Sequence, residues 1–145
     1  MASTKVMQSA ALAYRFEDGT PQVLMITSRN SGRWVLPKGH IEEGQTPRDA
    51  VSVEAYEEAG LRGDVGETEI GFYVYKKSDR PDVSKFKVAV YPMKVTDIEE
   101  DWPEKKKRRR KWMDFQTAAE SVNEPSLKEL LGEFGAMLNE VQTSH

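Results

Sequence analysis

The sequence predicts an α+β or α/β sandwich, because short apolar runs of strand length alternate with segments that carry helical signals. The strand-like runs are residues 9–16, 23–27, 34–36, 70–75 and 86–95, and the clearest helical segments are residues 46–59 and 126–138. The chain has 145 residues, of which 38% are hydrophobic and 31% charged, so it suffices for one packed domain and is short for two. We expect a single domain over residues 1–145, with its core at about 6–140 and frayed ends.

The first two strand-like runs are predicted to form a hairpin. Residues 9–16 and 23–27 are apolar and free of breakers, and Asp18-Gly19 between them tolerates the positive φ of a tight turn. The third run, residues 34–36, ends at Pro37.

The helix at residues 46–59 carries signals at both ends. Thr46 suits the N-cap, Pro47 suits the first helical position, and Asp49 stands where a capping-box acid belongs. Gly60 suits the C-cap.

The second half of the chain contains two strands followed by helices. Residues 70–75 are rich in aromatics, and residues 86–95 alternate apolar and polar side chains at their start. Residues 115–122 are predicted to form a short helix. An amphipathic helix follows at residues 126–138, where leucines and Phe134 recur at helical spacing.

Composition excludes several classes of site. The chain has no cysteine, so disulfides, thiolate nucleophiles and cysteine-based zinc sites are excluded. Residues 1–5 lack the apolar run of a secretory signal, and no window is apolar enough to span a membrane. We therefore expect a cytoplasmic protein without a membrane partner. The net charge is only −3, but the charges are unevenly distributed, with an acidic segment at residues 42–58 and a basic run at residues 105–111.

Three carboxylates form the clearest candidate site. Glu54, Glu57 and Glu58 stand at i, i+3 and i+4, so on a helix they project from one face. Like charges so placed repel unless a cation offsets them, and hard oxygen ligands suit Mg²⁺ or Mn²⁺. A solvated acidic helix face is the alternative.

The segment from Gly39 to Leu61 resembles the Nudix box, G-x5-E-x7-R-E-U-x-E-E-x-G-U, in which U is a bulky apolar residue. The matching residues are Gly39, Glu54, Glu57, Glu58, Gly60 and Leu61. Two charged positions differ, because Gln45 replaces the first glutamate and Val53 replaces the arginine. We hypothesise that these two side chains normally support each other, so that losing both leaves neither charge unpaired.

The resemblance implies an α/β/α sandwich, with a mixed central sheet covered by the glutamate helix and by the C-terminal helix. It also implies a hydrolase that cleaves a diphosphate linkage in a small phosphorylated substrate, with Mg²⁺ or Mn²⁺ as cofactor. On that basis Glu54, Glu57 and Glu58 are the expected catalytic residues. The same three glutamates, together with Gly39, are the expected metal-binding residues.

Shorter matches occur between residues 10 and 119, at Arg15, Ser28-Arg29, Arg33-Trp34, Glu57-Glu58-Ala59-Gly60, Glu100-Asp101-Trp102 and Arg110-Lys111-Trp112. Together they resemble the diphosphoinositol polyphosphate phosphohydrolase branch, whose members are also associated with diadenosine polyphosphates. Expected substrate contacts are Arg15, Ser28, Arg29, Lys38 and Arg110. Arginine can bind phosphate bidentately, so the basic run suits a polyphosphorylated ligand. A solvated charged loop is the alternative interpretation of this run. Nucleic acid is not expected, and a monomer is the default oligomeric state.

Three other functions stay open at this point. The chain could be a Nudix enzyme for mononucleotides or capped RNA ends. It could be a binding or sensor domain that keeps the fold without efficient turnover, as the changes at Gln45 and Val53 would allow. An unrelated acidic structural domain would require the box match to be accidental.

Overall fold

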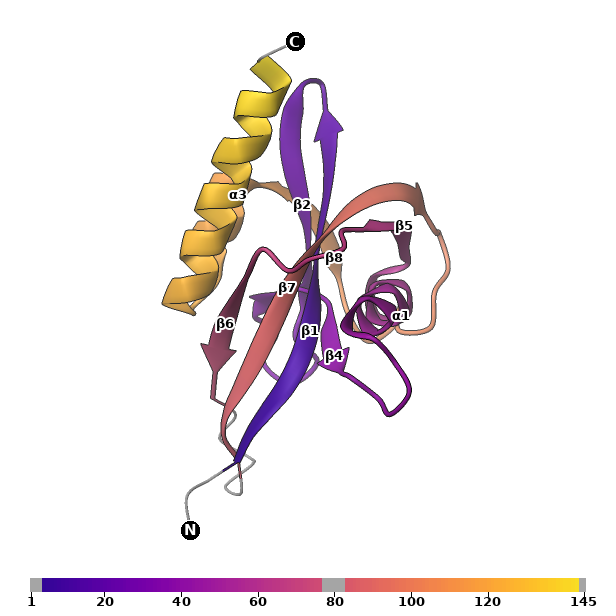
Figure 1. Cartoon of the computed structure of the whole chain (residues 1–145). Helices are drawn as coiled ribbons and strands as arrows, with labels where there is room; N and C mark the ends of the chain where they lie inside the picture. Colours follow the sequence, from indigo (N-terminus) through magenta and orange to yellow (C-terminus); the bar gives the residue numbers. More distant parts are fainter. Residues whose placement is uncertain (1–3, 77–82, 144–145) are drawn as a thin grey trace.

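The computed structural model describes residues 4–76 and 83–143, and within them eight strands form one mixed sheet. Figure 1 shows α3 along one side of this sheet and α1 on the other. In chain order the elements are β1 (Thr4–Glu17), β2 (Thr20–Thr27), β3 (Trp34–Val35), β4 (Lys38–His40), α1 (Pro47–Ala59), β5 (Leu61–Val65), β6 (Gly71–Tyr75), β7 (Val83–Ile98), β8 (Arg110–Asp114), α2 (Phe115–Ser121) and α3 (Pro125–Thr143).

The long strand β1 organises the sheet. It pairs in parallel with β7 and antiparallel with both β2 and β4. β3 and β8 extend the sheet from β2, whereas β5 and β6 pair with β7. The sheet is therefore mixed, and the predicted α+β class is confirmed.

Alternation along the strands supplies a hydrophobic core on each face of the sheet. Ala10 and Leu12 of β1 point to the face covered by α2 and α3, where they meet Leu127 and Leu131. The neighbouring residues of β1 point to the opposite face, where the apolar side of α1 covers them. The apolar side of α1 therefore packs on the sheet, and this packing holds in place the helix that carries the glutamates.

Local signals in the sequence produce the predicted turn and caps. Asp18 and Gly19 have φ of 51° and 79°, which closes the hairpin between β1 and β2. Thr46 and Asp49 form a complete capping box at the start of α1, with bonds of 3.0 and 3.1 Å. Gly60 ends the helix in the left-handed region, with φ 69°.

Three strands lie outside the predicted ones. β4 and β5 are short and flank α1. β8 begins inside the basic run, at Arg110, and ends after it, at Asp114. The terminal elements also run further than expected, because β1 begins at Thr4 and α3 continues to Thr143. The remaining residues of the predicted frayed ends, 1–3 and 144–145, lie outside the described residues.

None of the helices in the described part of the chain is long and apolar enough to cross a membrane. The cytoplasmic location and the monomeric state expected from the sequence stay predictions.

Candidate active site

The three glutamates of α1 occupy different environments. Glu54 is partly buried beneath β4, Glu57 is exposed, and the Glu58 side chain is buried with 8% of the residue accessible. A Cβ atom built on Gly39 would lie 2.5 Å from the Glu54 carboxyl carbon, closer than real contacts allow. A side chain at position 39 would therefore displace the Glu54 carboxylate.

Buried Glu58 has two neighbours that hold its carboxylate and a third that holds its backbone. Its Oε1 accepts a hydrogen bond from the backbone N–H of Lys38 at 3.1 Å, and its Oε2 lies 3.5 Å from Nη2 of Arg108. Its backbone carbonyl accepts a hydrogen bond from the indole N–H of Trp102 at 3.1 Å. These bonds tie α1 to β4 and to the segment before β8.

Burial and mutual repulsion perturb two of the carboxyl groups. Burial, and after it the nearby negative charges of Glu58, Glu57 and Glu104, together raise the pKa of Glu54 to about 7. Burial also raises the pKa of Glu58 to about 7, although Arg108 and the Lys38 N–H favour its ionised form. Perturbed carboxyl groups of this kind are common at active sites and at sites that bind cations.

The chemistry of these side chains suits a divalent metal. They supply hard oxygen ligands from one helix, and their repulsion is the situation that a cation relieves. In the conformation described for residues 4–76 and 83–143, no three acidic or histidine side chains converge closely enough to hold an ion. Glu58 instead faces Lys38 and Arg108. Glu54, Glu57 and Glu58 fit a metal by donor type and electrostatics, whereas their side chains do not converge in this conformation.

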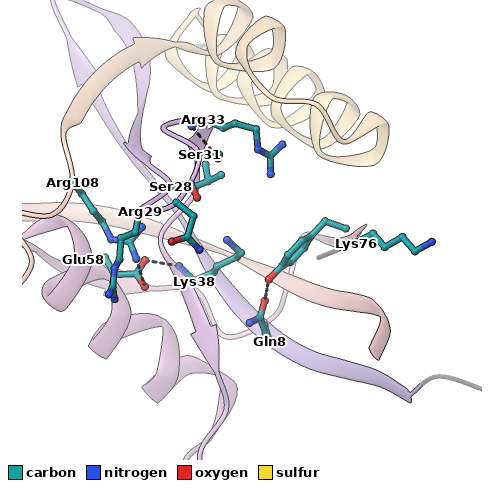
Figure 2. Close-up of a pocket in the computed structure, with 12 residues that line it drawn as sticks. Gln8, Ser28, Arg29, Ser31, Arg33, Lys38, Glu58, Lys76 and Arg108 are labelled. Atoms are coloured by element: carbon teal, nitrogen blue, oxygen red, sulfur yellow. Dashed lines mark hydrogen bonds and ion pairs between the residues drawn. The ribbon is translucent and has the colours of Figure 1, made fainter. Parts of the chain in front are cut away.

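A cavity of about 860 Å³ opens beside Glu58. Figure 2 shows Arg108, Arg29 and Glu58 close together at one end of it, and Gln8 and Lys76 at the other. Among the charged side chains that the structure describes in its wall, five are basic and only Glu58 is acidic. The lining residues are Gln8, Ser28, Arg29, Asn30, Ser31, Arg33, Val35, Lys38, Glu58, Tyr75, Lys76 and Arg108. Its volume is in the range typical of small-molecule sites.

Three of the five residues expected to contact substrate line this cavity, namely Ser28, Arg29 and Lys38. The other two do not. Arg15 donates to Gln22 at 2.9 Å and stacks on Trp112, on another part of the sheet.

Arg110 is held by the ends of two neighbouring segments. Its guanidinium donates to the backbone carbonyls of Ala59 and Glu99 at 2.8 and 2.7 Å, and lies 3.8 Å from the ring centroid of Trp102. These contacts make Arg110 a support for the C-terminal end of α1.

Arg108 occupies the site position that the sequence reasoning gave to Arg110. Its side chain is 12% exposed and reaches Glu104 at 2.8 Å, the carbonyl of Thr27 at 3.1 Å, and Glu58. Glu104 was also missed, although its charge acts on both Glu54 and Glu58. The i,i+4 spacing of Glu104 and Arg108 was a usable signal for this pair.

The two altered box positions lie apart from the cavity lining. The side-chain carbonyl of Gln45 accepts a hydrogen bond from the Glu42 N–H at 2.9 Å, while the Gln45 N–H donates to the Glu42 carbonyl at 3.0 Å. Gln45 thus closes the loop before α1 without a charge. Val53 is 41% exposed, so its apolar side chain faces solvent in part.

Known proteins resemble this chain in sequence. Nudix hydrolase 12, mitochondrial, from Arabidopsis thaliana is 37% identical over 117 residues, which cover 78% of this chain and 58% of that protein. Diphosphoinositol polyphosphate phosphohydrolase 2 from Rattus norvegicus is 33% identical over 113 residues, which cover 77% and 59%. The chain thus spans about six-tenths of the length of these curated relatives.

Solved structures share the fold. A C. elegans Ap4A hydrolase superimposes with a TM-score of 0.74 at 21% identity, covering 93% of this chain and 99% of that one. A Nitrosomonas europaea NUDIX hydrolase gives a TM-score of 0.70 at 18% identity, covering 92% and 90%. The NUDIX domain model matches residues 6–134, which include the glutamate helix and the cavity-lining residues. This chain therefore belongs to the Nudix family.

Proposed function

We propose that this chain hydrolyses a diphosphate linkage in a small, highly phosphorylated molecule, with Mg²⁺ or Mn²⁺ as cofactor. The observation that carries the proposal is the position of Glu58, which belongs both to the carboxylate helix and to the wall of a cation-lined cavity. Groups suited to a metal and groups suited to phosphate therefore lie side by side.

The carboxylates of Glu54, Glu57 and Glu58 would hold the metal, with the backbone of Gly39 close to Glu54. The metal would supply charge neutralisation on the phosphates and a lower pKa for the attacking water. Arg108 forms ion pairs with Glu58 and Glu104, at 3.5 and 2.8 Å. Phosphoryl transfer depends chiefly on such positioning and electrostatic stabilisation.

The cations of the cavity would bind the other phosphates of the substrate. Within the described residues neither Arg29 nor Lys76 has a carboxylate partner, so their charges are available to a ligand. The hydroxyl group of Ser28, on the same wall, would donate to a phosphate oxygen. Such a lining favours a substrate with several phosphates, such as a diphosphoinositol polyphosphate or a diadenosine polyphosphate.

The test is a panel of substrates assayed for phosphate release with Mg²⁺, with Mn²⁺ and with a chelator. The panel contains a diphosphoinositol polyphosphate, a diadenosine polyphosphate, a nucleotide sugar and a nucleoside triphosphate. We expect metal-dependent turnover of a polyphosphorylated member, and a loss of about 100-fold or more in Glu57→Gln. Exposed Glu133 of α3 provides the control, because Glu133→Gln removes an equivalent charge far from α1 in sequence. Equal activity in both variants would remove Glu57 from the site.

A second candidate function is a binding domain with little turnover, favoured by the uncharged Gln45 and the exposed Val53 in the box. Tight binding of a polyphosphate without phosphate release in any metal would support this function over hydrolysis.

A further inference from the structure

Tyr75 contributes the one aromatic ring to the cavity wall as far as the described residues define it. Its hydroxyl donates to Oε1 of Gln8 at 2.7 Å, which fixes the ring across the sheet. A fixed, half-buried tyrosine in a ligand site is a natural platform for a nucleobase, since stacking on an aromatic face strengthens binding about tenfold or more.

The first face of the Tyr75 ring is covered by Phe86. The two rings are nearly parallel, with an interplanar angle of 14° and centroids 5.0 Å apart. Tyr75 and Phe86 are directly paired between β6 and β7, and Phe86 is 2% exposed. A base could reach this face only by displacing a buried side chain.

Lys38 covers the second face, with its Nζ 5.0 Å from the centroid of the Tyr75 ring. Because the Phe86 ring already occupies one face, an ammonium group over the same Tyr75 ring lies on the other face. Lys38 pairs with Ala10 of β1, Phe86 pairs with Val6, and Gln8 lies between these two levels. The Tyr75 hydroxyl bonds to Gln8, so the ring extends from the level of Phe86 toward that of Lys38.

The backbone of Lys38 is held by α1, the helix that carries the three glutamates. Its N–H donates to Oε1 of Glu58 at 3.1 Å, so the residue that covers the ring is attached to the proposed metal-binding helix. The cover also carries a positive charge. Where a base would otherwise stack, the cavity therefore presents an ammonium group, and an ammonium group binds phosphate.

We propose that Lys38 is a specificity-determining residue: by covering the free face of Tyr75 it disfavours substrates that insert a nucleobase and favours polyphosphorylated substrates without one. This inference rests on the proposed function and sharpens it. It selects the diphosphoinositol polyphosphate class over the diadenosine polyphosphate class. The same side chain acts both as a steric cover and as a phosphate ligand.

Two substitutions at position 38 separate these roles. Lys38→Ala uncovers the ring and removes the charge, whereas Lys38→Met removes the charge but keeps an unbranched apolar chain over the ring. Lys76→Ala is the matched control, because it removes an exposed cation from the same cavity wall. Urea unfolding of each variant shows whether the fold is intact.

Each variant is assayed for kcat/KM with diphosphoinositol pentakisphosphate and with diadenosine pentaphosphate. We expect the wild type to prefer the inositol substrate. Lys38→Ala should lose about tenfold with that substrate and gain about tenfold with the diadenosine one. Lys38→Met and Lys76→Ala should lose with the inositol substrate and gain nothing with the other. Equal losses for both substrates in Lys38→Ala would overturn the proposal.

Calorimetric binding of the same two ligands without metal makes the test independent of turnover. A wild type that turns over neither substrate would refute the proposed hydrolase function. The ratio of the two Kd values would still decide whether Lys38 sets the specificity. A ratio that inverts in Lys38→Ala would support this role, and a ratio that stays constant would refute it.

Discussion

Removal of Arg108 tests whether its charge compensates buried Glu58. Arg108→Met keeps the aliphatic stem of the side chain and deletes its charge and its hydrogen bonds. With Arg108 present, burial raises the Glu58 pKa to about 7, and the Arg108 charge favours the ionised form. Without Arg108 the pKa rises further, so at alkaline pH the variant must either bury a carboxylate without its cation, on a side chain that is 10% exposed, or keep it protonated. Removing one partner of a buried ion pair costs about 3–5 kcal/mol, and the 3.5 Å separation favours the lower end, about 3 kcal/mol.

The same substitution should cost less in acid. The folded-state pKa of Glu58 is raised from 4.5 to about 7, so the stability that this group contributes is fully present below 4.5 and is lost as pH rises through 7. At pH 5.5 Glu58 is protonated in the folded protein. What remains is the loss of the Arg108 bonds to Thr27 and Glu104, about 1–2 kcal/mol.

Urea unfolding of metal-free protein, followed by tryptophan fluorescence at pH 5.5 and pH 8, measures both costs. Lys106→Met is the control, because Lys106 lies in the same basic run and is exposed. Adding Glu58→Gln to Arg108→Met should remove the pH dependence. An equal destabilisation at both pH values, unchanged by Glu58→Gln, would refute the reasoning that Arg108 compensates a buried charge.

Two further substitutions test the box. Gly39→Ala should reduce kcat at least tenfold and change the free energy of unfolding by about 1 kcal/mol or less, because the new Cβ displaces the flexible end of Glu54. A steady-state assay measures the first effect and urea unfolding the second. An unchanged kcat would mean that Glu54 acts from another position. Gln45→Glu with Val53→Arg should be more active and more stable than the sum of the single changes if these positions are coupled; additive single changes in a double-mutant cycle would show that they are independent.

The sequence predicted the elements whose signals are local. The capping box at Thr46, the left-handed Gly60 and the positive φ at Gly19 each follow from chemistry within a few residues, and the structure contains all three. Elements that depend on distant partners were missed. β4 has three residues and exists because Lys38, Gly39 and His40 pair with β1, some 30 positions earlier.

In the candidate site, too, local signals could be predicted and contacts between distant segments could not. The glutamates could be assigned to one helix face from their spacing, but their different burial depends on β4 and on the segment before β8. The choice between Arg108 and Arg110 could not be made from the basic run alone. Arg110 turns toward the carbonyls at the end of α1, whereas Arg108 turns into the cavity, and only the path of the chain distinguishes them.

The parallel pairing of β1 with β7 has a consequence for how the chain acquires its structure. The two strands join residues about 80 positions apart, along eleven paired positions in the middle of the sheet. Closing so large a loop has an entropic cost that must be met before the pairing stabilises anything, so this topology favours slow folding. During synthesis the hairpin and α1 leave the ribosome well before residue 83 does. Until then β1 offers an unpaired apolar edge, and this interval is when the nascent chain is most exposed to aggregation.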